Sequence, residues 1–259
     1  MKERLDLILV ELRFVESRTK AQWLIRKGYV TVDGKVIKKP SKHIDNASEI
    51  KLKSKFPYVG RGGLKLEAAL NYFNINVKDK VCVDIGASVG GFTDCLLKHG
   101  AKKVYAVDIA HNLLHPSLIC DKMHNRVVPK LDVDARELTD LDIEIDICTI
   151  DVTFASLKTI LPNTPNYLKD NGDIVALVKP LFETEFYELK KYEIIDDPQT
   201  LRQIIRELVE WSVEHKFYPY GLLKSPILGK GGSIEFFLYY RINKESVDFK
   251  LENRLNELL

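Results

Sequence analysis

The stretch 81–94 constrains the fold more than any other part of the sequence. It begins as an apolar strand that ends at Asp84 and then turns through three glycines into a helix. A second apolar run, 103–108, ends at Asp108, about one βα unit after Gly86. In doubly wound α/β proteins, such a glycine loop lets the backbone approach an adenosine, and the distant acid hydrogen-bonds the ribose. The pattern therefore predicts a Rossmann-like sheet with a nucleoside site at its edge.

The spacing of the glycines argues against a dinucleotide. Asp84-x-Gly86 followed by Gly90-Gly91 departs from G-x-G-x-x-G, and its acid lies inside the loop, where a carboxylate would repel a pyrophosphate. A carboxylate suits a ligand that carries an amino group, and S-adenosylmethionine has both an α-amino group and a sulfonium. On this stretch alone, a packing turn in any Rossmann-like domain remains the alternative.

Four ionisable side chains each follow an apolar run that reads as a strand: Asp84, Asp108, Asp151 and Lys179. Further strands are predicted at 126–129, within 143–151, at 173–179 and at the C-terminal end near 233–240, with helices at 64–73, 154–168 and 198–215. Alternating strands and helices favour a mostly parallel sheet, in which ligands bind outside the carboxyl ends of the strands. We therefore expect these side chains on one rim, with a structural Asp151–Lys179 salt bridge as the alternative.

The N-terminal 59 residues are basic, with 14 Lys/Arg against 7 Asp/Glu, whereas the remaining 200 carry 25 against 30. Apolar spacing predicts helices at 3–12 and 19–27, followed by a hairpin at Asp33-Gly34 and a strand at 49–54. This layout closely resembles the S4 RNA-binding domain over residues 3–54. The resemblance and the charge imply an S4-like domain at 1–55, a linker at 56–63, a second domain at 64–259, and these RNA-binding candidates: Arg4, Arg18, Lys20, Arg26 and Lys27.

Five motifs resemble the TlyA family, over nearly the whole chain. They begin at Gly60 (GRGGLKL), Asp84 (DIGASVGGFTD), Asp151 (DVTFASL), Val178 (VKPLFE) and Gly232 (GSIEF). The resemblance implies S-adenosylmethionine-dependent 2′-O-methylation of cytidines in ribosomal RNA, within ribosomal subunits. The wider FtsJ-like group of ribose methyltransferases shares a Lys-Asp-Lys-Glu tetrad, which falls here on these residues: Lys65, Asp151, Lys179 and Glu235.

The same resemblance implies the cofactor contacts. Asp84 is expected near the methionine amino group, Asp108 at the ribose hydroxyls and Asp134 near the adenine amino group. The other expected cofactor-binding residues belong to the glycine loop or to the tetrad: Gly86, Ser88, Gly90, Gly91, Phe92 and Asp151.

The chain departs from the family pattern at four places. Leu181 replaces a usual glutamine, Ser233 replaces a frequent asparagine, Val89 replaces a common threonine, and 190–195 lacks the usual Gly-Gly segment. Because the tetrad is intact, activity is still expected. His111 and His115 have the spacing of a metal site but lack the glutamate of H-E-x-x-H, so we expect no metal.

Composition points to a cytoplasmic protein that does not enter membranes. The sequence has no apolar run of about 18 residues, no signal-peptide pattern at its beginning and no C-x-x-C pair. Two other functions remain open: a non-catalytic factor that binds or assembles ribosomes, and a membrane-active haemolysin, as the family's older name suggests. A nicotinamide oxidoreductase is disfavoured by the glycine spacing.

Overall fold

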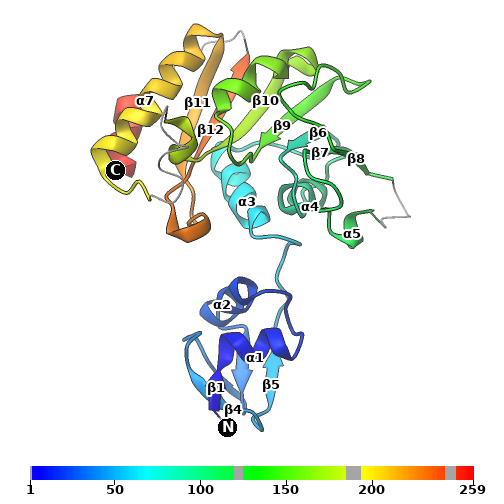
Figure 1. Cartoon of the computed structure of the whole chain (residues 1–259), viewed down its shortest axis with the longest axis vertical. Coiled ribbons are helices and arrows are strands. Elements are labelled where there is room, and N and C mark those ends of the chain that lie inside the picture. The colour runs from blue at the N-terminus through cyan, green and yellow to red at the C-terminus, as the bar shows by residue number, and fades with distance from the viewer. Residues whose placement is uncertain (1, 120–124, 185–193, 243–248) are drawn as a thin grey trace. The chain divides into compact units, whose positions relative to one another are not determined.

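The computed structural model of the protein describes residues 2–119, 125–184, 194–242 and 249–259. The chain divides into two compact units, Met1–Arg61 and Gly62–Leu259, and the division falls inside the predicted linker 56–63 (Figure 1). Across the described residues, none of the helices has the length and apolar character needed to span a membrane. Each unit has a hydrophobic core of its own and is described separately.

The first unit combines two helices with two small antiparallel sheets. Its elements are β1 (Lys2–Arg4), α1 (Leu5–Glu11), α2 (Arg18–Arg26), β2 (Val30–Val32), β3 (Lys35–Val36), β4 (His43–Asp45) and β5 (Ile50–Leu52). Strand β1 pairs with β4, and β2 lies between β3 and β5. The predicted hairpin is confirmed, since Asp33 and Gly34 both have positive φ between β2 and β3. Strands β1 and β4 were not predicted, and two residues of β1 fall within the helix predicted at 3–12.

The second unit is built on a seven-stranded sheet flanked by helices. Its strands are β6 (Val81–Ile85), β7 (Lys103–Asp108), β8 (Val127–Leu131), β9 (Ile145–Ile150), β10 (Leu168–Val178), β11 (Phe217–Lys224) and β12 (Phe236–Ile242). Its helices are α3 (Gly62–Phe73), α4 (Gly91–Lys98), α5 (Pro116–Ile119), α6 (Leu157–Ile160), α7 (Pro198–Glu214) and α8 (Leu251–Leu258), with short 3₁₀ turns η1 (Leu161–Asn166), η2 (Pro180–Glu183) and η3 (Lys230–Gly232).

The strand order is β11-β12-β10-β9-β6-β7-β8. Strands β10, β9, β6, β7 and β8 are parallel, and β12 joins β10 antiparallel. The predicted α/β class with a mostly parallel sheet is therefore confirmed. Because β12 runs in the opposite direction, its first residue lies at the rim where β10 ends, and Val178 pairs with Phe236.

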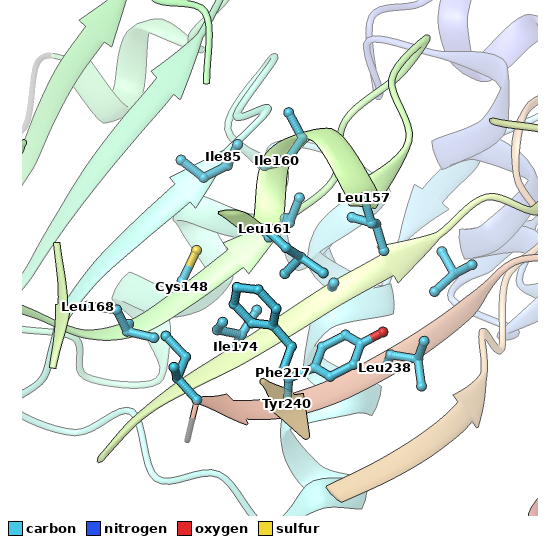
Figure 2. Packing of buried hydrophobic residues seen from close by; sticks show 14 of the residues in the cluster. Ile85, Cys148, Leu157, Ile160, Leu161, Leu168, Ile174, Phe217, Leu238 and Tyr240 are labelled. Carbon is cyan, nitrogen blue, oxygen red and sulfur yellow. The ribbon is translucent and has the colours of Figure 1, made fainter. Parts of the chain in front are cut away.

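The two faces of the sheet are covered by different helices. Phe73 of α3 packs against Tyr239 with ring centroids 5.4 Å apart, whereas the hydroxyl of the next residue, Tyr240, bonds Ser212 of α7. Successive strand residues point to opposite faces, so α3 and α7 lie on opposite sides. Figure 2 shows the α7-side core, where side chains of α6 meet those of the central strands, including Leu157, Cys148 and Ile174.

Two secondary-structure predictions in this unit were wrong. The helix expected over 154–168 is reduced to α6 and η1, because Pro162 and Pro165 lack the amide hydrogen that an α-helix needs. Strand β11, which contains Pro219 and Gly221, was not predicted. Proline is tolerated there because β11 is an edge strand.

Candidate active site

The candidate site lies where the direction of strand succession reverses. From β6 the chain moves outward to β7 and β8, and then returns to place β9 on the other side of β6. Loops that follow β6 and β9 therefore diverge, and the carboxyl ends of these strands form the switch point at which open α/β sheets bind ligands. Asp84, Asp108, Asp151 and Lys179 all lie at this rim, as the sequence predicted.

The glycine loop between β6 and α4 needs its glycines for space as well as for conformation. Gly86 has φ +81°, and a Cβ there would lie 2.5 Å from the carbonyl oxygen of Asp151. Gly90 has φ +90°, and a Cβ there would lie 2.2 Å from a methyl carbon of Leu118. Real side chains do not fit at these distances, so the two glycines let the loop pack closely against the segment after β9 and against Leu118 of α5.

Asp108 is held in place by backbone amides. Its carboxylate accepts hydrogen bonds from the amide of Ser88 in the glycine loop (2.7 Å) and from that of Ala110 (2.8 Å). The side chain is half-buried, and its second lone pairs remain for a ligand. A fixed carboxylate beside a glycine loop fits the vicinal hydroxyls of an adenosine ribose.

Asp84 lies beneath the glycine loop rather than on its surface. It is fully buried, and its two carboxylate oxygens accept hydrogen bonds from the hydroxyls of Thr93 (2.6 Å) and Thr149 (3.1 Å). Burial raises the pKa of Asp84 to about 7. The sequence placed this residue near the ligand amino group but did not identify the two threonines that occupy its oxygens.

Replacing Asp84 by asparagine is expected to raise the free energy of unfolding, and this gain is expected to increase with pH. The folded-state pKa of about 7 lies above the ordinary 3.8, so the contribution of Asp84 to stability is lost as the pH rises from about 4 to 7. Asparagine is neutral throughout and keeps an acceptor for one threonine. We expect its advantage in urea unfolding to grow by about 2 kcal/mol between pH 5 and pH 7.5.

Asp170, an exposed carboxylate on the same sheet, provides the control for this measurement. Asp170→Asn should change the free energy of unfolding little, and equally at both pH values. An Asp84→Asn effect that is flat with pH would show that Asp84 is already ionised in the folded protein.

Two further cofactor candidates also have partners within the protein. Asp134, in the loop after β8, is bound by the guanidinium of Arg136, which holds the pKa of Asp134 below its usual range. The amide of Val133 donates to the carbonyl oxygen of Asp108, so this loop borders the end of β7. Phe92 is buried against Phe237 and belongs to the core rather than to the surface of the crevice.

The four tetrad residues are arranged as two ion pairs. Lys65 of α3 donates to Glu235, which directly precedes β12, over 2.5 Å, and both side chains are less than one-tenth exposed. Gly229 lies against this pair, because a Cβ there would be 2.1 Å from a carboxylate oxygen of Glu235. The pairing explains the lysine in an otherwise apolar helix: its charge is buried together with its counter-charge.

Lys179 forms the second pair, with Asp151 at 2.6 Å. Its ammonium also donates to the carbonyl oxygen of Val152 (2.8 Å) and to the hydroxyl of Thr153 (3.0 Å). The contact with Asp151 is an ion pair without hydrogen-bond geometry, because Asp151 Oδ1 is buried and accepts no hydrogen bond from the described residues. At 17% exposure the Lys179 side chain stays within reach of a substrate at the rim.

The segments after β9 and β10 are connected by three sets of contacts, of which the sequence raised only the first, as the alternative Asp151–Lys179 salt bridge. Lys179 binds Asp151, the first residue after β9, and Phe154 contacts the ring of Phe182 with centroids 5.4 Å apart. Glu183 accepts hydrogen bonds from the Ser156 hydroxyl (2.5 Å) and from the Leu157 amide (2.9 Å). Phe154 is 58% exposed with φ +67°, a conformation that non-glycine residues rarely adopt. Both phenylalanines and Glu183 lie within the motifs that carry the tetrad, which was the available signal.

The basic residues predicted to bind RNA are unequally available. Arg18, Arg26 and Lys27 are exposed, and Arg4 is half-buried. Lys20 is buried instead: its ammonium is paired with Glu16 and lies 5.5 Å from the centre of the Phe56 ring. Lys20 was among the predicted RNA-binding residues, but its side chain packs within the first unit.

The departures from the family pattern are local. Leu181 is half-buried in η2, Val89 is exposed in the glycine loop, and the carbonyl oxygen of Ser233 accepts the amide of Gly229. Most of the segment at 190–195 lies outside the described residues. His111 is hydrogen-bonded to Asp132 (2.6 Å), across the loops that follow β7 and β8.

Comparisons with known proteins agree with this geometry. Residues 58–242 match the family described as FtsJ-like methyltransferase, and residues 3–50 match the S4 domain. A Bacillus subtilis protein named as a candidate rRNA methyltransferase is 41% identical, with 92% of this chain and 85% of that protein covered. The Mycobacterium tuberculosis 16S/23S rRNA (cytidine-2′-O)-methyltransferase TlyA is 34% identical, with 93% and 90% covered.

Solved structures are also similar to this chain. One from Streptococcus thermophilus, titled as a candidate hemolysin, has a TM-score of 0.72 and 35% identity, with 99% of this chain and 95% of that chain covered. A Listeria monocytogenes structure titled as a candidate S-adenosylmethionine-dependent methyltransferase has a TM-score of 0.52 and 12% identity, with 71% and 99% covered. At that identity the second likeness concerns the fold alone.

Proposed function

This chain belongs to the FtsJ-like methyltransferase family, and from this premise we propose that it transfers the methyl group of S-adenosylmethionine to the 2′-hydroxyl of cytidine in ribosomal RNA. The observation that carries the proposal is the position of Lys179. It ends a buried strand at the switch-point rim, is ion-paired with Asp151, and so lies next to the carbonyl that contacts Gly86. The reaction would take place in the cytoplasm, on ribosomal RNA or ribosomal subunits.

The residues around the crevice fit S-adenosylmethionine. The cofactor would lie beside the glycine loop, where Asp108 would bind the ribose hydroxyls and Asp134 would lie toward the adenine. Asp84 would act from below, by fixing the loop through Thr93, because its side chain is fully buried. When bound, the cofactor supplies an electrophilic methyl group on a sulfonium.

The protein's task is to present the 2′-oxygen and to remove its proton. Lys179 is the group placed for this, and a substrate hydroxyl would replace Thr153, the most distant of its three partners. To take up the proton, Lys179 must react as a neutral amine with its lone pair directed at the hydroxyl. Asp151 keeps the amine in position and stabilises the ammonium that forms. The ion pair of Lys65 and Glu235 fixes the beginning of β12, which pairs with the end of β10 next to Lys179.

Asp108→Ala is expected to weaken binding of S-adenosylmethionine, because hydrogen bonds to a charged acceptor are lost. The expected penalty is about 1–3 kcal/mol, or ~5-fold to ~150-fold in Kd. Asp108→Asn, which keeps one acceptor, should give an intermediate value, and Asp170→Ala on the same sheet should have no effect. Titration calorimetry checks the series, and equal affinity of Asp108→Ala and wild type would remove Asp108 from the cofactor site.

Transfer of tritium from labelled S-adenosylmethionine to purified ribosomal subunits tests the proposed function. The product is digested to nucleosides, and the label is expected in 2′-O-methylcytidine. Cofactor binding without transfer to either subunit would favour a non-catalytic ribosome-binding factor. Leakage of liposomes on addition of the protein would instead support the haemolysin alternative.

A further inference from the structure

A carboxylate joins the segment after β10 to the segment after β9. Glu183 is the last residue of η2, the turn that begins directly after Lys179. One of its oxygens accepts from the Ser156 hydroxyl (2.5 Å), and the other accepts from the amide of Leu157, the first residue of α6 (2.9 Å). The Phe182 amide donates to the carbonyl oxygen of Lys179 (2.9 Å) and closes the turn. Lys179 and Glu183 therefore belong to one short hydrogen-bonded turn.

The segment after β9 is held at both of its ends. At its beginning, the ammonium of Lys179 donates to the carbonyl oxygen of Val152 and to the hydroxyl of Thr153. At its end, it is held by the two hydrogen bonds to Glu183. Between these points Phe154 has φ +67°, a conformation that a bulky residue keeps only where its surroundings enforce it. Release of the segment at Glu183 would let it relax and would move the acceptors that direct the Lys179 ammonium.

Stability gives little reason for a carboxylate at this position. Glu183 is half-buried, and burial raises the pKa of Glu183 above its usual range, although the two hydrogen bonds and the charge of Lys158 favour the ionised form. The folded protein therefore holds this carboxylate less favourably than water does. Acids with such perturbed ionisation gather at functional sites, and this one joins two of the segments at the rim.

We propose that Glu183 is a positioning residue for methyl transfer, because it fixes the segment whose first residues direct the Lys179 amine toward the substrate hydroxyl. The proposal rests on the proposed function, in which Lys179 accepts the proton. Glu183 touches neither cofactor nor RNA in this arrangement. Its effect arises from orientation, and a misplacement of about 1 Å can lower a rate by ~100-fold.

Glu183→Ala removes both hydrogen bonds and is expected to lower the single-turnover rate of methyl transfer by about 10-fold to 100-fold. The Kd values for S-adenosylmethionine and for ribosomal RNA should remain close to those of wild type. Tritium transfer at saturating cofactor and ribosomal subunits gives the rate. Titration calorimetry gives the cofactor affinity and, from its stoichiometry, the fraction of folded protein, and filter binding gives the RNA affinity. A wild-type rate in Glu183→Ala overturns the proposal.

Glu183→Gln tests whether the two links suffice. Its carbonyl oxygen can accept from the Leu157 amide, and its NH₂ group can donate to the Ser156 hydroxyl, which then acts as the acceptor. Most of the wild-type rate should therefore be kept. A rate as low as that of Glu183→Ala overturns the proposal.

Asp197→Ala is the matched control for a loss of stability. Asp197 accepts from the amide and the hydroxyl of Thr200 (both 2.7 Å) at the beginning of α7, so the variant also deletes two hydrogen bonds of a carboxylate at a helix start. We expect a lower melting temperature, as for Glu183→Ala, and an unchanged rate. A rate that falls as far as in Glu183→Ala assigns the effect to folding and overturns the proposal.

Combination with Lys179→Ala separates positioning from a general defect. If Glu183 acts through Lys179, Glu183→Ala should lower the rate no further in a protein that already lacks the lysine. A further fall by the same factor as in wild type overturns the proposal. Absence of methyl transfer by wild type itself is a distinct result, which contradicts the proposed function before any variant is compared.

Discussion

Replacing Lys179 by alanine is expected to lower the rate of methyl transfer by about two to four powers of ten. The side chain ends a buried strand at the cofactor rim and is the group placed to take the proton of the 2′-hydroxyl. Affinity for S-adenosylmethionine should remain close to that of wild type, since the glycine loop and Asp108 are unchanged. Single-turnover transfer of tritium to ribosomal subunits gives the rate, and titration calorimetry gives the affinity.

Lys169 provides the matched control, because it lies in the same strand, β10, and is also paired with an aspartate, Asp146 at 2.9 Å. Lys169→Ala removes an equivalent charge near the other end of the strand and should leave the rate of transfer unchanged. Turnover by Lys179→Ala within a few-fold of the Lys169→Ala rate would exclude Lys179 as the proton acceptor.

Deleting residues 1–55 is expected to abolish methylation of ribosomal RNA while leaving cofactor binding intact. The first unit carries most of the excess positive charge, and phosphate contacts release counterions, so its loss should flatten the salt dependence of RNA binding. The second unit retains its own core and all of the cofactor candidates. Filter binding across a salt series, paired with cofactor calorimetry on both proteins, measures the two effects.

The cut precedes the predicted linker 56–63, so that the beginning of α3 and Lys65 are undisturbed. A full-length Arg26→Ala/Lys27→Ala variant provides an intermediate, because both side chains are exposed and can be removed without shortening the chain. If the shortened protein binds and methylates ribosomal RNA as well as the full chain, the first unit is not the RNA anchor.

The rim of the sheet was predictable because its signals are local. Asp84, Asp108 and Lys179 each end an apolar run, and parallel strands bring such ends to one edge. The position of Glu235 at this rim has no local signal, because it depends on the antiparallel pairing of Val178 with Phe236. The resemblance supplied this residue, and the register explains its position.

Partners distant in sequence could not be predicted from the residues themselves. Lys65 and Glu235 are 170 positions apart, and only the packing of α3 beside β12 brings them together. The burial of Lys20 likewise depends on Phe56, which folds back over the first unit. The predicted helix over 154–168 was wrong for a local reason, because Pro162 and Pro165 interrupt it and the chain forms a 3₁₀ turn there.

The central claim is that this protein methylates cytidine ribose in ribosomal RNA through Lys179. Its most direct test is to map 2′-O-methyl groups on rRNA from cells that lack the gene, complemented with wild type, Lys179→Ala or Lys169→Ala. The account predicts at least one cytidine 2′-O-methyl group that is absent without the gene, restored by wild type and by Lys169→Ala, and not restored by Lys179→Ala. An identical methylation map in all four strains, or full restoration by Lys179→Ala, would contradict it.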